Sequence, residues 1–262
     1  MDTKPRRGIQ SIEIGSTLLV ALATHLKPMP LRELAREAGI SVGKAHPYLV
    51  SFVKVGFVIQ EPATGLYALG PLALQIGLAK LCQLDPVREA TPVITGLADA
   101  TEQSVAVAVW GNLGPTIVQL VEPVPMHVNL RVGAVMSVRN TATGRLFATY
   151  LPRRMLDHFL AGDAARLALH EDKKQRSKSE FETELAENRR RGMARTIGDP
   201  IPGINAFSAP VFDATGNIVL AITVMGPATS FDSKWDGSIA ASLREACGQI
   251  SRQMGFIAAG PL

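Results

Sequence analysis

Residues 30–55, which read PLRELAREAGISVGKAHPYLVSFVKV, constrain this chain more than any other stretch. The first part places Leu31, Leu34, Ala35 and Ala38 on one side of a helix, opposite charged side chains. Gly39 predicts the end of that helix, because glycine adopts the left-handed C-terminal conformation without steric cost. The part after Gly39 is again amphipathic. The stretch therefore predicts two short helices joined by a tight turn.

The second of these helices has an apolar side and a polar side. Ala45, Leu49, Phe52 and Val53 are expected to face inward, and the other faces carry Lys44, His46, Tyr48, Ser51 and Lys54. In a helix-turn-helix, the second helix enters the major groove of DNA while the first braces it. An ordinary pair of antiparallel helices is the alternative that this stretch alone leaves open.

The residues that follow favour the DNA-binding interpretation. Residues 56–60 and 66–69 are short β-type runs, and Glu61-Pro62-Ala63-Thr64-Gly65 between them suits a turn. A hairpin directly after a helix-turn-helix is a wing, which can contact the phosphates beside the groove. Residues 1–70 also hold eight Lys/Arg against five Asp/Glu, whereas the rest of the chain holds nineteen against eighteen. We therefore predict a winged helix-turn-helix.

Length and composition exclude several other classes of protein. With 262 residues the chain exceeds the usual size of one domain. No segment approaches the roughly 20 apolar residues of a membrane span, and residues 1–8 lack the apolar core of a signal peptide. The only cysteines, Cys82 and Cys247, suggest neither a disulfide framework nor a metal cluster. We expect a cytoplasmic protein without metal or cofactor.

The remaining chain predicts a linker helix and an α+β domain. We expect a DNA-binding domain over 9–70, a linker helix over 71–85 and a larger domain over 86–262. The linker is apolar and almost uncharged, so it should be buried, against a partner subunit or against its own second domain. The larger domain alternates antiparallel strands (105–110, 116–121, 193–197, 204–211, 218–225) with helices (87–101, 143–150, from 152, 179–191, 233–256), and residues 127–138 look extended. Ser179 and Glu182 are expected to form a capping box at the start of one helix.

No constellation of catalytic residues is visible. The chain has no glycine-rich phosphate loop, no HExxH, no Gly-x-Ser-x-Gly and no paired CxxC. The stronger signal lies in residues 138–145, where small and polar groups precede a helix whose free N–H groups suit an anionic or carbonyl ligand. The stiff loop 198–203, Gly-Asp-Pro-Ile-Pro-Gly, is a second candidate wall for a small-molecule pocket. Plain turn chemistry explains both loops equally well.

The chain resembles the IclR family of bacterial transcriptional regulators over nearly its full length. The segments that carry the resemblance are LRELAREAGISVGKAHPYLVSFVKVGFV, GLYALGPLALQIG, ENRRRGMA and GINAFSAPVFDATGNIVLAITVMGP. The resemblance implies an N-terminal winged helix-turn-helix, a linker helix and a GAF-like effector-binding domain. It also implies homodimers or homotetramers on operator DNA, with an effector such as an aromatic or short carboxylic acid.

The resemblance also implies where the effector binds. By position, the family's effector site falls on Asn140, Thr141, Ala142, Thr143, Gly144, Thr196, Ile204, Ala206, Thr223 and Met225. This chain has Thr196 at a commonly acidic position and Ala206 at a commonly cysteine position. Without the acid, the site should accept a carboxylate more readily, with Arg139 or Arg145 as its partner.

For DNA, the candidate contacts are Arg32, Ser41, Lys44, His46, Tyr48, Ser51 and Thr64. Pro47 stands where the family often has arginine. Because proline inside a helix costs about 3 kcal/mol, we expect Gly43 to cap the second helix and regular structure to begin near Gly43 or Lys44.

The sequence thus predicts a DNA-binding regulator controlled by a small organic molecule. Two alternatives stay open. One is an enzyme with an accessory helix-turn-helix, which a catalytic constellation would favour. The other is a scaffold without ligand, which a filled pocket would favour.

Overall fold

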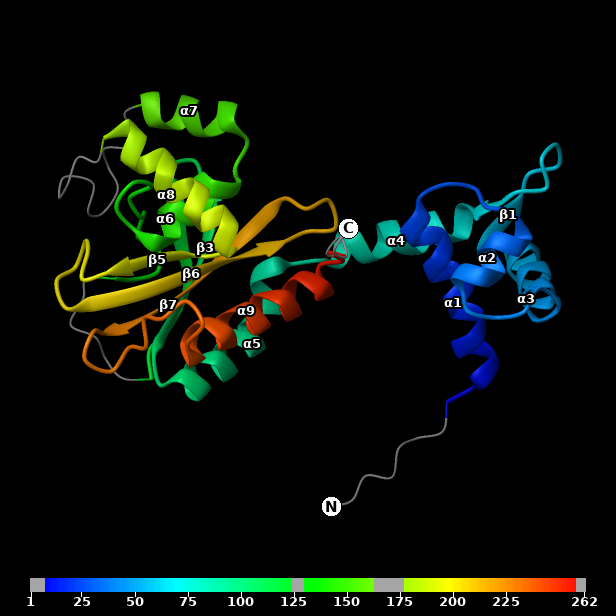
Figure 1. Cartoon of the computed structure of the whole chain (residues 1–262), viewed down its shortest axis with the longest axis horizontal. Coiled ribbons are helices and arrows are strands. Elements are labelled where there is room, and N and C mark those ends of the chain that lie inside the picture. Colours follow the sequence, from blue (N-terminus) through cyan, green and yellow to red (C-terminus); the bar gives the residue numbers. More distant parts are fainter. Residues whose placement is uncertain (1–7, 124–129, 163–176, 258–262) are drawn as a thin grey trace, which may run out of the picture. The chain divides into compact units, whose positions relative to one another are not determined.

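The helix-turn-helix and its wing belong to the first of two units. The computed structural model describes residues 8–123, 130–162 and 177–257. It divides into one unit over Met1–Leu84 and another over Asp85–Leu262. The first unit contains α1 (Gln10–His25), α2 (Leu31–Glu37), α3 (Val42–Val55), β1 (Val58–Gln60), β2 (Tyr67–Leu69) and α4 (Pro71–Gln83) (Figure 1).

The apolar faces of α1, α2 and α3 meet in one small core. Leu18, Leu34 and Leu49 are fully buried there, and Val58 and Tyr67 of the wing close it. Burying a leucine side chain contributes about 1.5–3 kcal/mol, so this cluster holds the three helices together. Gly39 has a φ of +67°, as the predicted helix end requires.

The start of α3 corrects the prediction from the sequence. The helix begins at Val42, Ser41 occupies the N-cap position, and Pro47 lies inside the helix. Gly43 is therefore a helical residue and not the cap. Pro47 has no N–H to donate to the carbonyl of Gly43, so the helix loses one internal hydrogen bond on its exposed side, where solvent can satisfy the carbonyl.

The wing is a short antiparallel hairpin that is attached firmly to the helices. Ile59 pairs with Ala68 in its centre. Met29, between α1 and α2, exchanges backbone hydrogen bonds of 2.9 and 2.8 Å with Tyr67, which extends the pairing by one bridge. The wing is thus held in position relative to α3.

Helix α4 follows the wing and contributes no buried residue. Leu74, Leu78 and Leu81 are each at least half exposed. They recur at i, i+4 and i+7 and so form one continuous apolar stripe.

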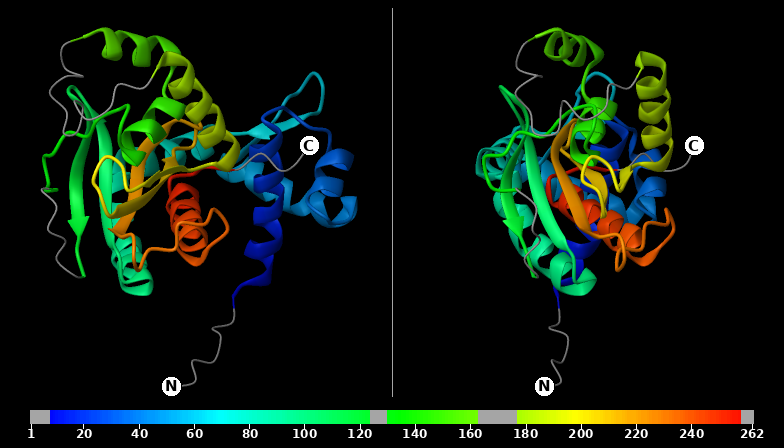
Figure 2. Two further views of the ribbon diagram at one scale, coloured as in Figure 1. Left: turned by 60° about the vertical axis from the view of Figure 1, so that its left-hand side comes forward. Right: turned by 90° about the vertical axis from the view of Figure 1, so that its left-hand side faces the viewer.

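The second unit is a five-stranded antiparallel sheet in the order β4-β3-β7-β6-β5. Its strands are β3 (Ser104–Gly111), β4 (Gly114–Val121), β5 (Ala194–Ile197), β6 (Ile204–Phe212) and β7 (Ile218–Pro227). Its helices are α5 (Pro86–Thr101), α6 (Ala142–Tyr150), α7 (Arg153–Ala161), α8 (Lys178–Arg191) and α9 (Ser238–Gln253). Helices α5 and α9 cover one face of the sheet, and α6 covers the other with α8 packed on it (Figures 1 and 2).

Two local predictions for this unit are wrong. The capping box of α8 uses Ser177 and Glu180, whereas Glu182 pairs with Arg153 of α7. Helix α9 begins five residues later than expected, because Asp232 accepts hydrogen bonds from backbone N–H groups and holds the preceding segment as a turn. Within the described part of 127–138, Val135 bridges to Thr116, Met136 donates its N–H to the carbonyl of Pro115 at 2.7 Å, and Gly133, with a φ of +89°, breaks the extended chain.

Candidate functional site

The exposed side of the helix-turn-helix carries most of the predicted DNA contacts. Six of them lie on the surface: Arg32 on α2, Ser41, Lys44, His46 and Ser51 at or along α3, and Thr64 at the tip of the wing. Two of these hydroxyls are already engaged. Ser51 donates to the carbonyl of Pro47 at 3.0 Å, and Thr64 donates to Glu61. The charged and imidazole groups are the ones left to project outward.

Tyr48, the seventh predicted contact, lies partly inside the unit. Its ring is half-buried against the core of the first unit, beside Phe52. A Cβ at Gly15 of α1 would lie 3.2 Å from the Tyr48 ring and 3.0 Å from Phe52, so this glycine makes the room for both rings. Tyr48 therefore braces α3 against α1.

In the second unit, a cavity lies between the start of α6, the sheet and the loop 198–203. Its volume is about 50 Å³. It is lined by Met136, Thr141, Ala142, Thr143, Thr196, Asp199, Pro200, Ile201, Ile204, Ala206, Thr223 and Met225. Eight of the predicted effector residues are in this lining: Thr141, Ala142, Thr143, Thr196, Ile204, Ala206, Thr223 and Met225.

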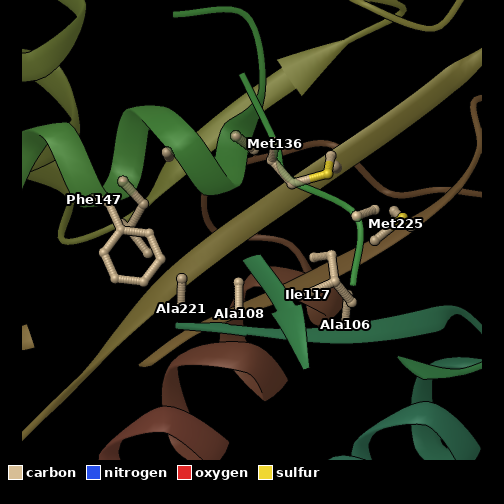
Figure 3. Close-up of a cluster of buried hydrophobic side chains, with 12 residues drawn as sticks. Ala106, Ala108, Ile117, Met136, Phe147, Ala221 and Met225 are labelled. Atoms are coloured by element: carbon tan, nitrogen blue, oxygen red, sulfur yellow. The ribbon is translucent and has the colours of Figure 1, made fainter. Parts of the chain in front are cut away.

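The cavity exists because the sheet presents small side chains to α6. Ala106, Ala108, Ala194, Ala206 and Ala221 come from four strands and share one cluster with Phe147 and Leu146 of α6. Figure 3 shows Ala106, Ala108 and Ala221 on this face, with Phe147 at one end of the cluster and Met136 and Met225 at the other. Alanine at these places lets the helix approach closely and leaves space toward the methionine end.

The polar side of the cavity is a chain of buried hydroxyls. Thr223 on β7 donates to Ser208 on β6 at 2.9 Å, and its oxygen lies 2.8 Å from that of Thr143 on α6. Because the single Thr223 proton goes to Ser208, Thr143 is the donor to Thr223. The chain links α6 to two strands, and the lone pairs of Thr143 remain at the cavity.

The start of α6 adds backbone donors. Thr141 is the N-cap, and its hydroxyl accepts the N–H of Gly144 at 3.0 Å. Ala142 and Thr143 are the first helical residues, so their N–H groups have no partner within the helix. Both residues are buried and line the cavity. Such N–H groups, with the positive end of the helix dipole, favour a carboxylate or carbonyl oxygen.

Two residues of the predicted effector site and both predicted arginine partners lie outside the lining. Gly144 is required by packing, since a Cβ there would be 2.0 Å from the carbonyl oxygen of Ser137. The N–H of Asn140 donates a hydrogen bond to the hydroxyl oxygen of Ser137 at 3.0 Å. Arg139 lies over the ring of Phe181 at 5.8 Å, and Arg145 pairs with Glu184 at 3.0 Å. The two arginines are thus directed to α8, and neither is part of the cavity lining.

The lining also contains residues that the family resemblance did not predict individually. Met136 comes from the segment before α6, and Asp199, Pro200 and Ile201 come from the loop 198–203. The loop itself was a candidate because of its composition, but which of its side chains turn inward is set by its pairing. Asn205 holds the N–H of Gly198 at 3.0 Å and so folds the loop back over the sheet.

A larger groove of about 630 Å³ lies on the opposite face, where α9 crosses β6. The polar side chains that line it are already paired. Ser251 accepts the N–H of Phe212 at 3.0 Å and donates to the carbonyl of Cys247 at 2.7 Å, Arg244 donates to the carbonyl of Trp235, and Arg252 pairs with Glu245. The smaller cavity, where polar groups converge, has the properties of a binding site.

Among the residues that the structure describes, no group of His, Cys, Asp or Glu is arranged to hold a metal ion. Within the same described ranges, no helix is long and apolar enough to cross a membrane.

A winged helix-turn-helix unit joined to an α+β unit with a polar internal cavity is the architecture of a ligand-responsive DNA-binding protein. Comparison with known proteins agrees with this architecture. Residues 11–62 match the IclR helix-turn-helix domain, and residues 79–252 match the bacterial transcriptional regulator IclR C-terminal domain. The chain belongs to the IclR family of bacterial transcriptional regulators, whose members are not enzymes.

Individual relatives span nearly the whole chain. The glycerol operon regulatory protein of Streptomyces griseus is 29% identical over 252 residues, which cover 95% of this chain and 98% of that protein. The transcriptional repressor IclR of Escherichia coli is 24% identical over 230 residues, covering 86% and 83% respectively. The crystal structure of Pseudomonas aeruginosa HmgR matches with a TM-score of 0.85 and 33% identity, covering 96% of this chain and all of that one.

Proposed function

We propose that this regulator binds operator DNA through α3 and the wing, and that a small organic effector in the cavity beneath α6 controls this binding. The convergence of the α6 N–H groups and the buried hydroxyls on one cavity is the observation that carries the effector site. A scaffold without ligand has no need of a cavity lined by polar groups. The proposed role on chromosomal DNA places the protein in the cytoplasm.

The effector class follows from the size and chemistry of the cavity. About 50 Å³ is far below the roughly 300–1,000 Å³ of sites that enclose drug-sized ligands. A short carboxylic acid fits best, with its carboxylate on the N–H groups of Ala142 and Thr143 and its remaining atoms against Thr223 and Met225. An aromatic acid requires the loop 198–203 to move outward. Glycerol, suggested by the name of one relative, would hydrogen-bond to the hydroxyls of Thr143 and Thr223 and would not need the N–H groups at the start of α6.

Thermal denaturation with short carboxylates, benzoate and glycerol tests the effector site. Ala206→Val directs two methyl groups into the cavity and leaves the hydroxyl chain intact. We expect stabilisation by a short carboxylate in the wild type and its loss in Ala206→Val, with operator binding retained as proof of folding. Ala214→Val, in the exposed β6–β7 turn, is the matched control. A ligand response that survives in Ala206→Val places the effector elsewhere.

The DNA surface is tested by salt dependence. Lys44 projects from the exposed side of α3, so we propose that it contacts a phosphate. Lys44→Ala should then weaken binding to all sequences alike and reduce the salt slope by about one unit. Lys234→Ala, an exposed lysine of the second unit, is the control and should bind as the wild type. Equal affinity of Lys44→Ala and wild type at several salt concentrations would remove Lys44 from the interface.

We also propose that the active species is a homodimer or homotetramer that is joined in part through α4. The stripe of Leu74, Leu78 and Leu81 has the spacing of a coiled-coil seam and has no cover within the first unit. Light scattering should give at least a dimeric mass at micromolar concentration, and Leu78→Glu should lower it. A monomeric wild type would rule out this assembly.

A further inference from the structure

The outward side of α3 carries three apolar residues in a row. Ala45 and Leu49 mark the buried side. Gly43, Pro47 and Val50 lie on the opposite side and follow each other at intervals of four and three residues, with Ser51 and Lys54 beside them. All three are exposed, and 53% of the Val50 surface is accessible. We call these three residues the apolar ridge.

Nothing within the fold requires glycine at position 43. A Cβ placed there meets no atom within 4 Å, and the residue is an ordinary member of α3 without the positive φ of Gly39 or Gly56. Glycine in a helix is about 0.5–1 kcal/mol less favourable than alanine. The missing side chain therefore serves no packing within the unit. It would allow a binding partner to approach the backbone of α3 closely.

The other two ridge residues offer hydrocarbon and no donor. Pro47 has no N–H, and the hydroxyl of Ser51 beside it donates back to the Pro47 carbonyl. Val50 presents methyl groups. Lys54 continues the same line four residues after Val50, Lys44 lies at one flank of the ridge, and both lysines are exposed. These lysines complement phosphates, and the ridge between them is left to face the bases.

We propose that the apolar ridge reads thymine in the operator. In the major groove the 5-methyl group of thymine is the apolar feature of the base edges, and apolar side chains recognise it. Gly43 would let the helix backbone approach the bases closely, while Val50 and the ring of Pro47 pack on thymine methyl groups. This inference rests on the proposed role of α3 as the recognition helix.

The first test removes methyl groups from both sides of the contact, one from a thymine and two from Val50. An operator duplex is selected from random sequence with the full-length wild-type protein, and each thymine is then replaced by deoxyuridine. We expect about fourfold weaker binding at one or two positions of each half-site, as the loss of one buried methyl group predicts. Val50→Ala should bind more weakly and lose this sensitivity. Val55→Ala is the matched control, because Val55 is equally exposed at 56% but lies on another side of α3.

The second test uses a change whose two effects have opposite signs. Gly43→Ala should raise the midpoint of thermal unfolding, since its methyl group meets no atom of the fold, and should weaken operator binding at least tenfold. Wild-type sensitivity to deoxyuridine in Val50→Ala, or wild-type affinity in Gly43→Ala, would overturn the inference. If Lys44→Ala weakens binding in that case, α3 still faces DNA and only the ridge is wrong. If Lys44→Ala also binds normally, the proposed role of α3 fails with it.

Discussion

Thr223→Val tests whether the hydroxyl chain beneath α6 stabilises the second unit. The two side chains have nearly the same shape, so the substitution removes the hydroxyl and adds a methyl group. The hydroxyl of Thr223 takes part in two hydrogen bonds, to Ser208 and with Thr143, and all three residues are buried.

The magnitude follows from these contacts. Each lost hydrogen bond costs about 1 kcal/mol, and a buried hydroxyl left without its partner adds about 1–3 kcal/mol. The additional methyl group returns about 0.8 kcal/mol. We therefore expect a loss of about 2–4 kcal/mol. For a domain of this size, 1 kcal/mol shifts the midpoint by roughly 2–4 °C, so the midpoint should fall by about 4–16 °C.

Thr196→Val is the matched control for this measurement. Thr196 lines the same cavity and is buried, but in the described chain its hydroxyl makes no hydrogen bond to a protein group. The same chemical change should therefore leave the midpoint nearly unaltered. Both variants are unfolded by heat at the same protein concentration, because the midpoint of the proposed oligomer would depend on it. Equal midpoints for the two variants would refute the assignment of the hydroxyl chain.

Three further outcomes are expected. Burial raises the pKa of the Cys247 thiol, so a thiol reagent should label exposed Cys82 in the folded protein and Cys247 only after unfolding, as mass spectrometry would show. Burial opposes ionisation of Asp213, but hydrogen bonds from its turn outweigh burial and lower the pKa of its carboxyl group. Asp213→Asn should therefore lose most stability at neutral pH, and this loss should vanish as the pH falls through the lowered pKa. Urea unfolding at several pH values measures it. Gly114→Ala should destabilise more than Gly133→Ala by thermal unfolding, because both glycines have a positive φ but only at Gly114 would the Cβ meet a side chain, at 2.8 Å from the Phe159 ring; equal losses would contradict this.

Local sequence was sufficient to predict most of the elements. The spacing of Leu31, Leu34 and Ala35 predicts α2, and Gly39 predicts its end, because both signals depend only on neighbouring residues. The same reasoning failed at the start of α8. Ser177 and Ser179 both precede a glutamate by three residues, and the pairing of Glu182 with Arg153 on another helix decides between them.

The position of the cavity was predictable and its chemistry was not. Thr223 and Met225 alternate with apolar neighbours along β7, so the sequence by itself determined that they share one face. Only the tertiary structure decided that Arg145 turns toward Glu184 of α8 and that Ile201 turns into the cavity. The packing of helices and strands decides which residues far apart in the chain come into contact. For example, no residue near Tyr48 in the sequence shows that Gly15 of α1 leaves room for the Tyr48 ring. Periodicity sets the faces of each element, whereas packing between elements sets which side chains remain free to bind.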